Sequence, residues 1–177
     1  MASDPDAKSD QRIEIHSGDI TQLDVDAIVN AANSRLQPGG GVCGAIHRAA
    51  GRNLREACAR IGGCETGQSV ATDGYDLKAK SVIHTVGPVW HGGDRNEDAL
   101  LASCYRTALK IAKQIGARSV AFPAISTGIY GFPLDRATGI AVATVREFLA
   151  VDQALTRVVF AVFGPEAEAA YRRELGR

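Results

Sequence analysis

Short apolar runs alternate along this chain with longer segments that have the period of an α-helix. The sequence predicts strands over residues 12–16, 27–33, 67–74, 80–86, 119–125 and 156–163. It predicts helices over residues 43–61, 96–116, 135–150 and 165–175, with Asp135 as a cap and Pro165 as a first residue. This alternation is typical of one α/β sandwich, in which a mostly parallel sheet lies between helices and binds ligands at the carboxyl ends of its strands.

The length and the composition both indicate one ordinary globular domain. The chain has 177 residues, and no linker or internal repeat divides it. Hydrophobic residues make up 45% and charged residues 23%, which excludes disorder of the whole chain. Residues 1–11 are polar, do not resemble a signal peptide and are expected to form a disordered tail before a domain over residues 12–177. No apolar stretch reaches the ~18 residues of a membrane span, so a membrane is not an expected partner.

The charges and the cysteines limit the expected partners further. Twenty lysines and arginines balance twenty aspartates and glutamates, so nucleic acid is not an expected partner, and local backbone N–H groups would have to do most of the binding of any anion. The four cysteines match neither a CxxC redox motif nor a zinc knuckle. They are expected to be reduced thiols of a cytoplasmic protein that needs no metal and no cofactor. Without a hydrophobic surface stripe, a monomer is the expected state.

Two loops that follow predicted strands are rich in glycine. Residues 39–44, GGGVCG, open a helix, where adjacent glycines allow close approach and a helix N-terminus offers free N–H donors. Residues 126–131, STGIYG, again lie between a strand and a helix and offer hydroxyls together with N–H groups. One such loop indicates little, but two in one small α/β domain favour a ligand that carries phosphate.

Two other families share parts of these motifs. Residues 39–44 match the Gly-x-Gly-x-x-Gly pattern of Rossmann dehydrogenases, but here the glycines follow the second strand and no acidic residue is spaced to bind a ribose. Residues 124–128 are similar to the nucleophile elbow of α/β-hydrolases, which requires a histidine after the serine. All four histidines precede Ser126. The sequence therefore disfavours both a dehydrogenase and a serine hydrolase.

Five motifs, in this order along the chain, resemble the macrodomain family and within it the MacroD-type ADP-ribose hydrolases and O-acetyl-ADP-ribose deacetylases. They are GDIT at 18–21, IVNAAN at 28–33, GGGVCGAIHRAAG at 39–51, HTVGP at 84–88 and PAISTGIYGFP at 123–133. The resemblance covers about residues 12–175. It implies a three-layer α/β/α sandwich with a mixed, mostly parallel central sheet and an ADP-ribose cleft on the crest of that sheet.

The resemblance also implies a role for each matching residue. Asp19 would accept a hydrogen bond from the adenine amino group beside the backbone of Ile20, and Phe163 would stack on the adenine. Asn33 would bind the distal ribose, and Phe132 would lie beside it. The loops would approach the ribose and wrap the diphosphate through Gly39, Gly40, Gly41, Val42, Ser126, Thr127, Gly128, Ile129 and Tyr130. Structural roles stay open for Asp19 as a cap, Phe163 as a core residue and Phe132 as a support beneath the loop.

At Cys43 the chain departs from the MacroD-type pattern, which has an aspartate there to activate or position the attacking water. Losing a general base costs on the order of 10²–10⁴ in rate. Viral macrodomains are similar to this chain in having a small apolar residue at that position, and a water held between Asn33 and the substrate's own phosphate could attack instead. Cys43 could also form a dyad with His47 one helical turn on, but a small buried residue is the favoured interpretation.

Two functions follow from the resemblance. The first is a hydrolase that removes mono-ADP-ribose from acidic side chains of proteins, or acetate from O-acetyl-ADP-ribose, with Asn33 as its retained catalytic residue. The second is a non-catalytic reader of ADP-ribosylated proteins, which the cysteine in place of the aspartate favours. Both would bind ADP-ribose through the same residues. Asn33 and the intact loop over residues 126–131 make the hydrolase the preferred hypothesis.

Overall fold

The computed structural model describes residues 4–177, and within them six strands form one mixed sheet in the order β1-β6-β5-β2-β4-β3. Neighbouring strands run parallel, except that the edge strand β3 is antiparallel to β4. The strands are β1 (Ile13–Ser17), β2 (Ala27–Ala32), β3 (Ser69–Asp73), β4 (Ser81–Val86), β5 (Ser119–Phe122) and β6 (Arg157–Val162). The expected mostly parallel sheet is confirmed.

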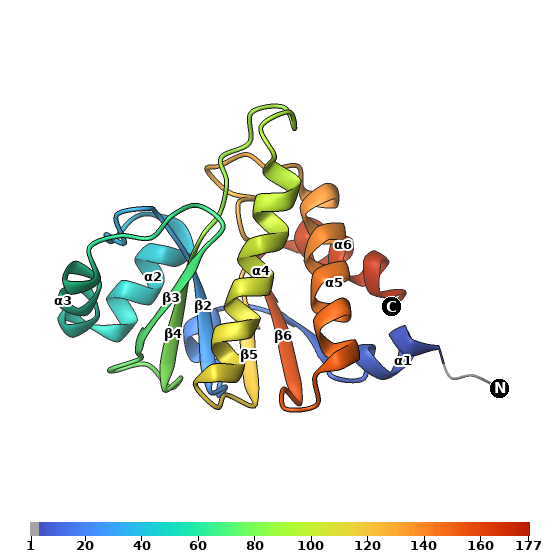
Figure 1. The fold of residues 1–177 in the computed structure, drawn as a ribbon, viewed down its shortest axis with the longest axis horizontal. Coiled ribbons are helices and arrows are strands. Elements are labelled where there is room, and N and C mark those ends of the chain that lie inside the picture. The colour runs from blue at the N-terminus through green and yellow to red at the C-terminus, as the bar shows by residue number, and fades with distance from the viewer. Residues whose placement is uncertain (1–3) are drawn as a thin grey trace.

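Helices cover both faces of the sheet (Figure 1). One face carries α4 (Glu97–Gln114), α5 (Leu134–Val151) and α6 (Pro165–Leu175). The other carries α2 (Gly41–Ala50), α3 (Arg52–Ile61) and the short 3-10 helix η1 (Ile20–Gln22). The expected three-layer α/β/α sandwich is therefore the fold of this chain.

Two apolar clusters join the sheet to its helical layers. In β2, Val29 faces the cluster under α4 and α5, whereas its neighbour Ile28 faces the cluster under α2. In β4, Ile83 and Val82 divide between the two faces in the same way. Strands buried on both sides appear in a sequence as continuous apolar runs, which is why these strands are recognisable without structural information. Burying each such side chain contributes about 1.5–3 kcal/mol.

The expected disordered tail over residues 1–11 is wrong for most of its length. The helix α1 (Pro5–Asp10) packs against α5, while residues 1–3 lie outside the described part of the chain. Asp10 forms a bidentate ion pair with Arg146 of α5, with both N–O distances at 2.7 Å. This helix depends on a contact with a distant segment rather than on an apolar periodicity of its own, so its sequence resembles that of a tail.

The helix expected over residues 43–61 is two helices. The helix α2 ends where the N–H of Gly51 donates to the carbonyl of His47 at 3.1 Å, and α3 begins at the next residue. Gly51 has a φ of +88°, which favours glycine, and a Cβ atom there would be 2.8 Å from Oδ2 of Asp76. A single glycine thus turns the chain between two segments that share one helical periodicity.

The other helices lie close to their expected positions. Pro165 is the first residue of α6, as predicted, because the first residues of a helix have no N–H bond to lose. The cap of α5 differs from the prediction: Pro133 is the N-cap, and Asp135 lies within the first turn. An acidic side chain there still interacts favourably with the positive end of the helix dipole.

Candidate functional site

A cleft with a volume of about 410 Å³ lies at the carboxyl ends of the parallel strands. Loops that follow β1, β2, β5 and β6 line it, because parallel neighbours end at the same edge of the sheet. Among its lining residues are Ile20, Asn33, Gly39, Gly40, Gly41, Val42, Cys43, Ser126, Thr127, Gly128, Ile129, Tyr130 and Phe163. None of the lining residues is an aspartate, a glutamate or a histidine. The cleft therefore offers backbone donors and hydroxyls rather than charged side chains.

The first glycine loop presents free N–H groups at the start of α2. Gly40 caps this helix without a side-chain hydrogen bond, and the first helical N–H bond runs from Gly44 to the carbonyl of Gly40 at 3.3 Å. Within residues 4–177, the backbone N–H groups from Gly39 to Cys43 have no hydrogen-bond acceptor. Free donors at the positive end of a helix dipole attract an anion.

The second glycine loop is held in a strained conformation around Ser126. This residue has a φ of +66°, and non-glycine residues there cost on the order of 1–3 kcal/mol. Its hydroxyl is buried, and the described part of the chain gives it no hydrogen-bond partner. The N–H of Phe132 donates to the carbonyl of Ser126 at 2.9 Å and closes the loop. The N–H groups of residues 128–130 have no acceptor in residues 4–177. The loop therefore presents unpaired N–H and O–H donors at the cleft.

The two loops face each other across the cleft. A Cβ atom on Gly40 would lie 3.8 Å from Cδ1 of Ile129, whose side chain is 90% exposed. At another wall of the cleft, Phe163 is 66% exposed, which excludes its alternative role as a core residue. The cleft thus combines two facing loops that carry free N–H groups with a largely exposed aromatic ring.

Asn33 holds the loop that leads from β2 to the glycines. Its Nδ2 donates to the carbonyl of Gln37 at 2.8 Å, and its Oδ1 accepts from the N–H of Gln37 at 3.1 Å. Leu36, between them, is buried and has a φ of +57°. Each polar atom of the Asn33 amide keeps capacity for a second hydrogen bond, so the side chain can bind a ligand without releasing the loop.

Cys43 lies on the cleft wall in front of a buried polar network. It is 5% exposed, and its Sγ is 3.7 Å from both the carbonyl of Gln37 and Nδ2 of Asn30. Nδ2 of Asn30 is also 3.1 Å from Nδ1 of His84, whose Nε2 lies 3.0 Å from Oγ1 of Thr72. Since the amide nitrogen is a donor, Nδ1 of His84 accepts and its proton is on Nε2. Burial lowers the pKa of His84 to about 4, so the ring is neutral at pH 7.

No Cys–His dyad forms between Cys43 and His47. Both ring nitrogens of His47 are buried without a hydrogen-bond partner in the described residues. Burial, and then the charge of Arg55, lower the pKa of His47. A buried ring that bonds neither nitrogen to the thiol is not placed to take its proton. The interpretation of Cys43 as a small residue in the aspartate's place stays a prediction.

Comparisons with known proteins decide the family. The model of the Macro domain family matches residues 29–141. A Macro domain-containing protein of Chlorobaculum tepidum is 57% identical over 157 residues, which cover 89% of this chain and 91% of that relative. The chain belongs to the Macro domain family. The resemblance that its five motifs indicated is confirmed.

Two further matches cover almost all of this macrodomain. A protein of Klebsiella pneumoniae (strain 342) that is named O-acetyl-ADP-ribose deacetylase is 54% identical over 166 residues, 92% of this chain and 95% of its own. The crystal structure of a Trypanosoma brucei macrodomain in complex with ADP-ribose has a TM-score of 0.89 and 43% identity, covering 98% of this chain and 72% of that one. This macrodomain is therefore similar to relatives in both sequence and backbone.

Two of the residues predicted for the site do not line the cleft. Asp19 is exposed and caps η1, where its Oδ1 accepts from the N–H and the hydroxyl of Thr21 at 2.9 and 2.8 Å. Phe132 is buried in the core, 2% exposed, with the ring of Trp90 at a centroid distance of 4.7 Å. The alternative roles of a cap and of a support beneath the loop describe what both side chains do in this structure.

Trp90 connects this support to the second glycine loop of the macrodomain. Its backbone N–H donates to the carbonyl of Tyr130 at 2.8 Å while its ring contacts Phe132. The guanidinium carbon of Arg136 lies 5.1 Å from the indole centroid, and two hydrogen bonds of 2.8 and 2.7 Å orient that side chain toward Asp98. Sequence reasoning missed Trp90, although it is the second residue after the HTVGP motif.

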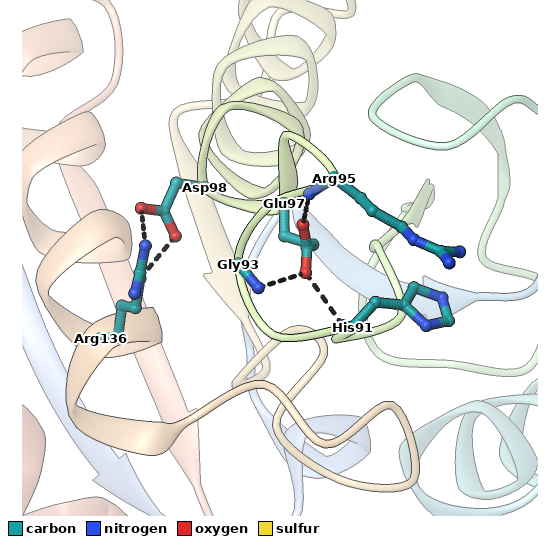
Figure 2. Close-up of polar contacts among 6 residues, drawn as sticks. All are labelled: His91, Gly93, Arg95, Glu97, Asp98 and Arg136. Carbon is teal, nitrogen blue, oxygen red and sulfur yellow. Dashed lines mark hydrogen bonds and ion pairs between the residues drawn. The ribbon is translucent and has the colours of Figure 1, made fainter.

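A buried carboxylate holds the loop that carries Trp90. Glu97 is 1% exposed and accepts the backbone N–H groups of His91, Gly93 and Arg95 at 2.9, 2.8 and 2.5 Å (Figure 2). Burial opposes ionisation of Glu97, but these N–H groups outweigh it and lower its pKa to about 2. Nothing local in the sequence marks this glutamate, because the first turn of a helix often carries an acidic residue for its dipole alone.

Two general properties bear on the expected partners. Within residues 4–177, no three side chains of histidine, cysteine, aspartate or glutamate gather where they could hold a metal ion, and all four cysteines are free thiols. In the same part of the macrodomain, no helix is long and apolar enough to cross a membrane.

Proposed function

We propose that this macrodomain binds ADP-ribose in the cleft and hydrolyses ester bonds to its distal ribose. The substrates are mono-ADP-ribosylated acidic side chains of proteins, O-acetyl-ADP-ribose, or both. The observation that carries this proposal is the pair of opposed loops, whose free N–H groups suit a diphosphate between them. The name of the Klebsiella pneumoniae relative and the ligand of the Trypanosoma brucei structure support it.

The adenine end of the ligand would lie between β1 and β6. The ring of Phe163 is free to stack on a base, a contact worth about 1–3 kcal/mol. Both bonds to Asp19 use Oδ1, which leaves Oδ2 to accept a hydrogen bond from an exocyclic amine. Because Thr21 fixes the orientation of that carboxylate, Asp19 would select adenine beside the backbone of Ile20 with little loss of side-chain entropy.

The diphosphate would bind between the glycine loops. The N–H groups of residues 39–43 point from the start of α2, and those of residues 128–130 from the opposite loop. The hydroxyl of Ser126, buried without a partner in residues 4–177, would donate to a phosphate oxygen and gain the hydrogen bond that it lacks. Charge-assisted bonds of this kind would repay the backbone strain at Ser126.

The reaction would take place beside Asn33. Its amide would hold a ribose hydroxyl and a water, and the substrate's own phosphate would accept the proton as the water attacks the carbonyl carbon of the ester. The bond from that carbon to the ribose oxygen then breaks, and the ribose oxygen takes up a proton. The free N–H groups at the start of α2 would stabilise the developing charge. Such a substrate-assisted route needs no carboxylate at Cys43.

A second candidate function is that of a reader, which binds ADP-ribose and releases nothing. One observation favours it: the cleft has no carboxylate or imidazole among its lining residues, and Cys43 stands where the resemblance implies a catalytic aspartate. Binding would use the same loops in both cases.

Single-turnover release of ADP-ribose from a glutamate-linked mono-ADP-ribosylated protein distinguishes the two functions. For the hydrolase, the wild type and Cys43→Ala release ADP-ribose at similar rates, whereas Asn33→Ala is slower by on the order of 10²-fold. Binding of ADP-ribose without release, together with release by Cys43→Asp, would establish the reader. Loss of release in Cys43→Ala would assign the chemistry to the thiol, and absence of binding would reject both functions.

A further inference from the structure

A second groove lies behind the loop that carries Asn33. It has a volume of about 660 Å³ and is lined by residues 35–38, which follow β2, and by Arg55, Ala59 and Gly62 at the other side. The main chain of Gln37 separates it from the cleft, because Gln37 lines this groove while its N–H and carbonyl bond to Asn33 on the cleft side. Gln37 thus contacts Asn33, beside which the reaction is proposed to occur, and also lines the groove.

The groove carries positive charge without a counter-charge. Arg35 and Arg55 are both exposed, and residues 4–177 provide neither guanidinium with an ion pair or a hydrogen bond. The surrounding segment, residues 35–62, contains five arginines and one glutamate, although the whole chain is neutral. Other arginines of this fold, such as Arg146 with Asp10, form ion pairs within the chain. These two arginines are therefore available to an anionic partner.

We propose that this groove binds acidic side chains of the protein segment that carries the ADP-ribosyl group. The inference rests on the proposed function, in which the modified side chain is attached to the distal ribose beside Asn33. A chain that leaves the cleft there passes Gln37 and reaches Arg35 and Arg55. Each guanidinium matches a carboxylate with two parallel hydrogen bonds, so acidic neighbours of the modified residue are preferred.

The lining of the groove favours a peptide over a single-stranded nucleic acid, which would also supply anions. Proteins that bind single strands stack the bases on aromatic side chains. The groove is lined by arginine, leucine, glutamine, proline, alanine and glycine, with no aromatic residue. Pro38 and Ala59 are exposed and offer a small apolar surface that suits the aliphatic parts of a peptide.

The test compares binding of two ADP-ribosyl peptides that contain a triazole linkage, which the macrodomain cannot hydrolyse. One peptide has glutamates around the modified position, and the other has glutamines. Isothermal titration with each peptide and with free ADP-ribose is done for the wild type, for the double variant Arg35→Gln/Arg55→Gln, and for Arg106→Gln. Arg106 is the matched control, because it is exposed on α4, across the sheet, and makes no ion pair in residues 4–177.

The wild type and Arg106→Gln are expected to bind the glutamate peptide about three- to tenfold more tightly than the glutamine peptide, and high salt removes the difference. The double variant binds both peptides equally and keeps the wild-type affinity for ADP-ribose. A charge reversal, Arg35→Glu/Arg55→Glu, favours a lysine-flanked peptide.

Four outcomes overturn the proposal. Equal affinity of the wild type for both peptides, with ADP-ribose bound, rejects the groove and leaves the proposed function intact. A preference that survives in the double variant places the acidic peptide elsewhere. Displacement of the peptide by a short oligothymidylate, at a lower concentration than by a polyglutamate peptide of equal charge, assigns the groove to nucleic acid. Failure of the wild type to bind ADP-ribose rejects the proposed function and the groove with it.

Discussion

The hydroxyl of Ser126 lies against the backbone of Gly87, because a Cβ atom placed on that glycine would be 2.2 Å from Oγ and 2.7 Å from Cγ2 of Ile125. Gly87→Ala is therefore expected to displace the second glycine loop and weaken ADP-ribose binding by at least about tenfold. Calorimetric titration measures the change. Gly139→Ala, at a helical glycine whose nearest neighbour is 3.8 Å away, is the control that keeps wild-type affinity. Equal affinities would show that the loop tolerates the displacement.

Phe163 is expected to contribute to ligand binding, whereas Phe132 is expected to contribute to the stability of the fold. Phe163→Ala removes a 66% exposed ring, so the free energy of unfolding stays near wild type while ADP-ribose affinity falls by about 1–3 kcal/mol. Phe132→Ala empties a position that is 2% exposed and is expected to cost about 3–5 kcal/mol of stability. Urea denaturation and calorimetric titration of both variants check the pair. A Phe163→Ala variant with unchanged affinity would place adenine elsewhere.

Much of this fold is predictable because its central strands are buried on both faces. The apolar runs that contain Ile28 and Val82 identify strands without any tertiary information. The break at Gly51 is not predictable in this way, since one glycine within a helical periodicity is compatible with a continuous helix. The helix α1 is missed for another reason: its contact with α5 includes the ion pair between Asp10 and Arg146, and such a long-range contact leaves no local pattern.

The candidate site also has one part that the sequence predicts and another that it does not. Its glycine loops are visible in the sequence, because free N–H groups at a helix start and at a tight turn need particular residues. The supports of those loops are not visible. Trp90 contacts Phe132 and Arg136, which are distant in the sequence, and the burial of Phe132 depends on the ring that covers it. Glu97 accepts from backbone N–H groups just before it, which no particular side chain marks. Asn30 and His84 form one network only because β2 and β4 are neighbours.

Replacing the carboxylate of Glu97 is expected to loosen the loop over residues 91–96. In Glu97→Gln one acceptor oxygen becomes an amide, which faces N–H groups and cannot accept from them. Hydrogen exchange of residues 91–95 then becomes faster, and Tm falls. Since the folded pKa of about 2 is below the usual glutamate pKa of 4.5, the stabilisation by Glu97 is present above pH 4.5 and is lost as pH falls toward 2.

Mass-spectrometric exchange and melting curves between pH 7 and pH 2 measure both effects of Glu97→Gln. The matched control is Glu147→Gln, since Glu147 is exposed on α5 and has no hydrogen bond or ion pair within residues 4–177. Exchange in residues 91–95 that matches the wild type would show that the loop does not depend on the carboxylate.

The neutral ring of His84 is expected to make the macrodomain sensitive to acid above the range in which carboxylates titrate. Its folded pKa of about 4 lies below the usual histidine pKa of 6.5, so the unfolded chain binds the proton first as pH falls. The contribution of the neutral His84 ring to the free energy of unfolding is therefore at its maximum above pH 6.5, and it decreases by about 3 kcal/mol as pH falls to 4. In His84→Gln the amide oxygen can accept from Asn30 and nothing titrates, so the free energy of unfolding is lower at pH 7 but varies less between pH 6.5 and 4. Urea denaturation across this range measures the slope of the unfolding free energy against pH, and His91→Gln, at an exposed histidine, is the control. An unchanged slope in His84→Gln would assign the acid sensitivity to other groups, of which His47 is the first to test.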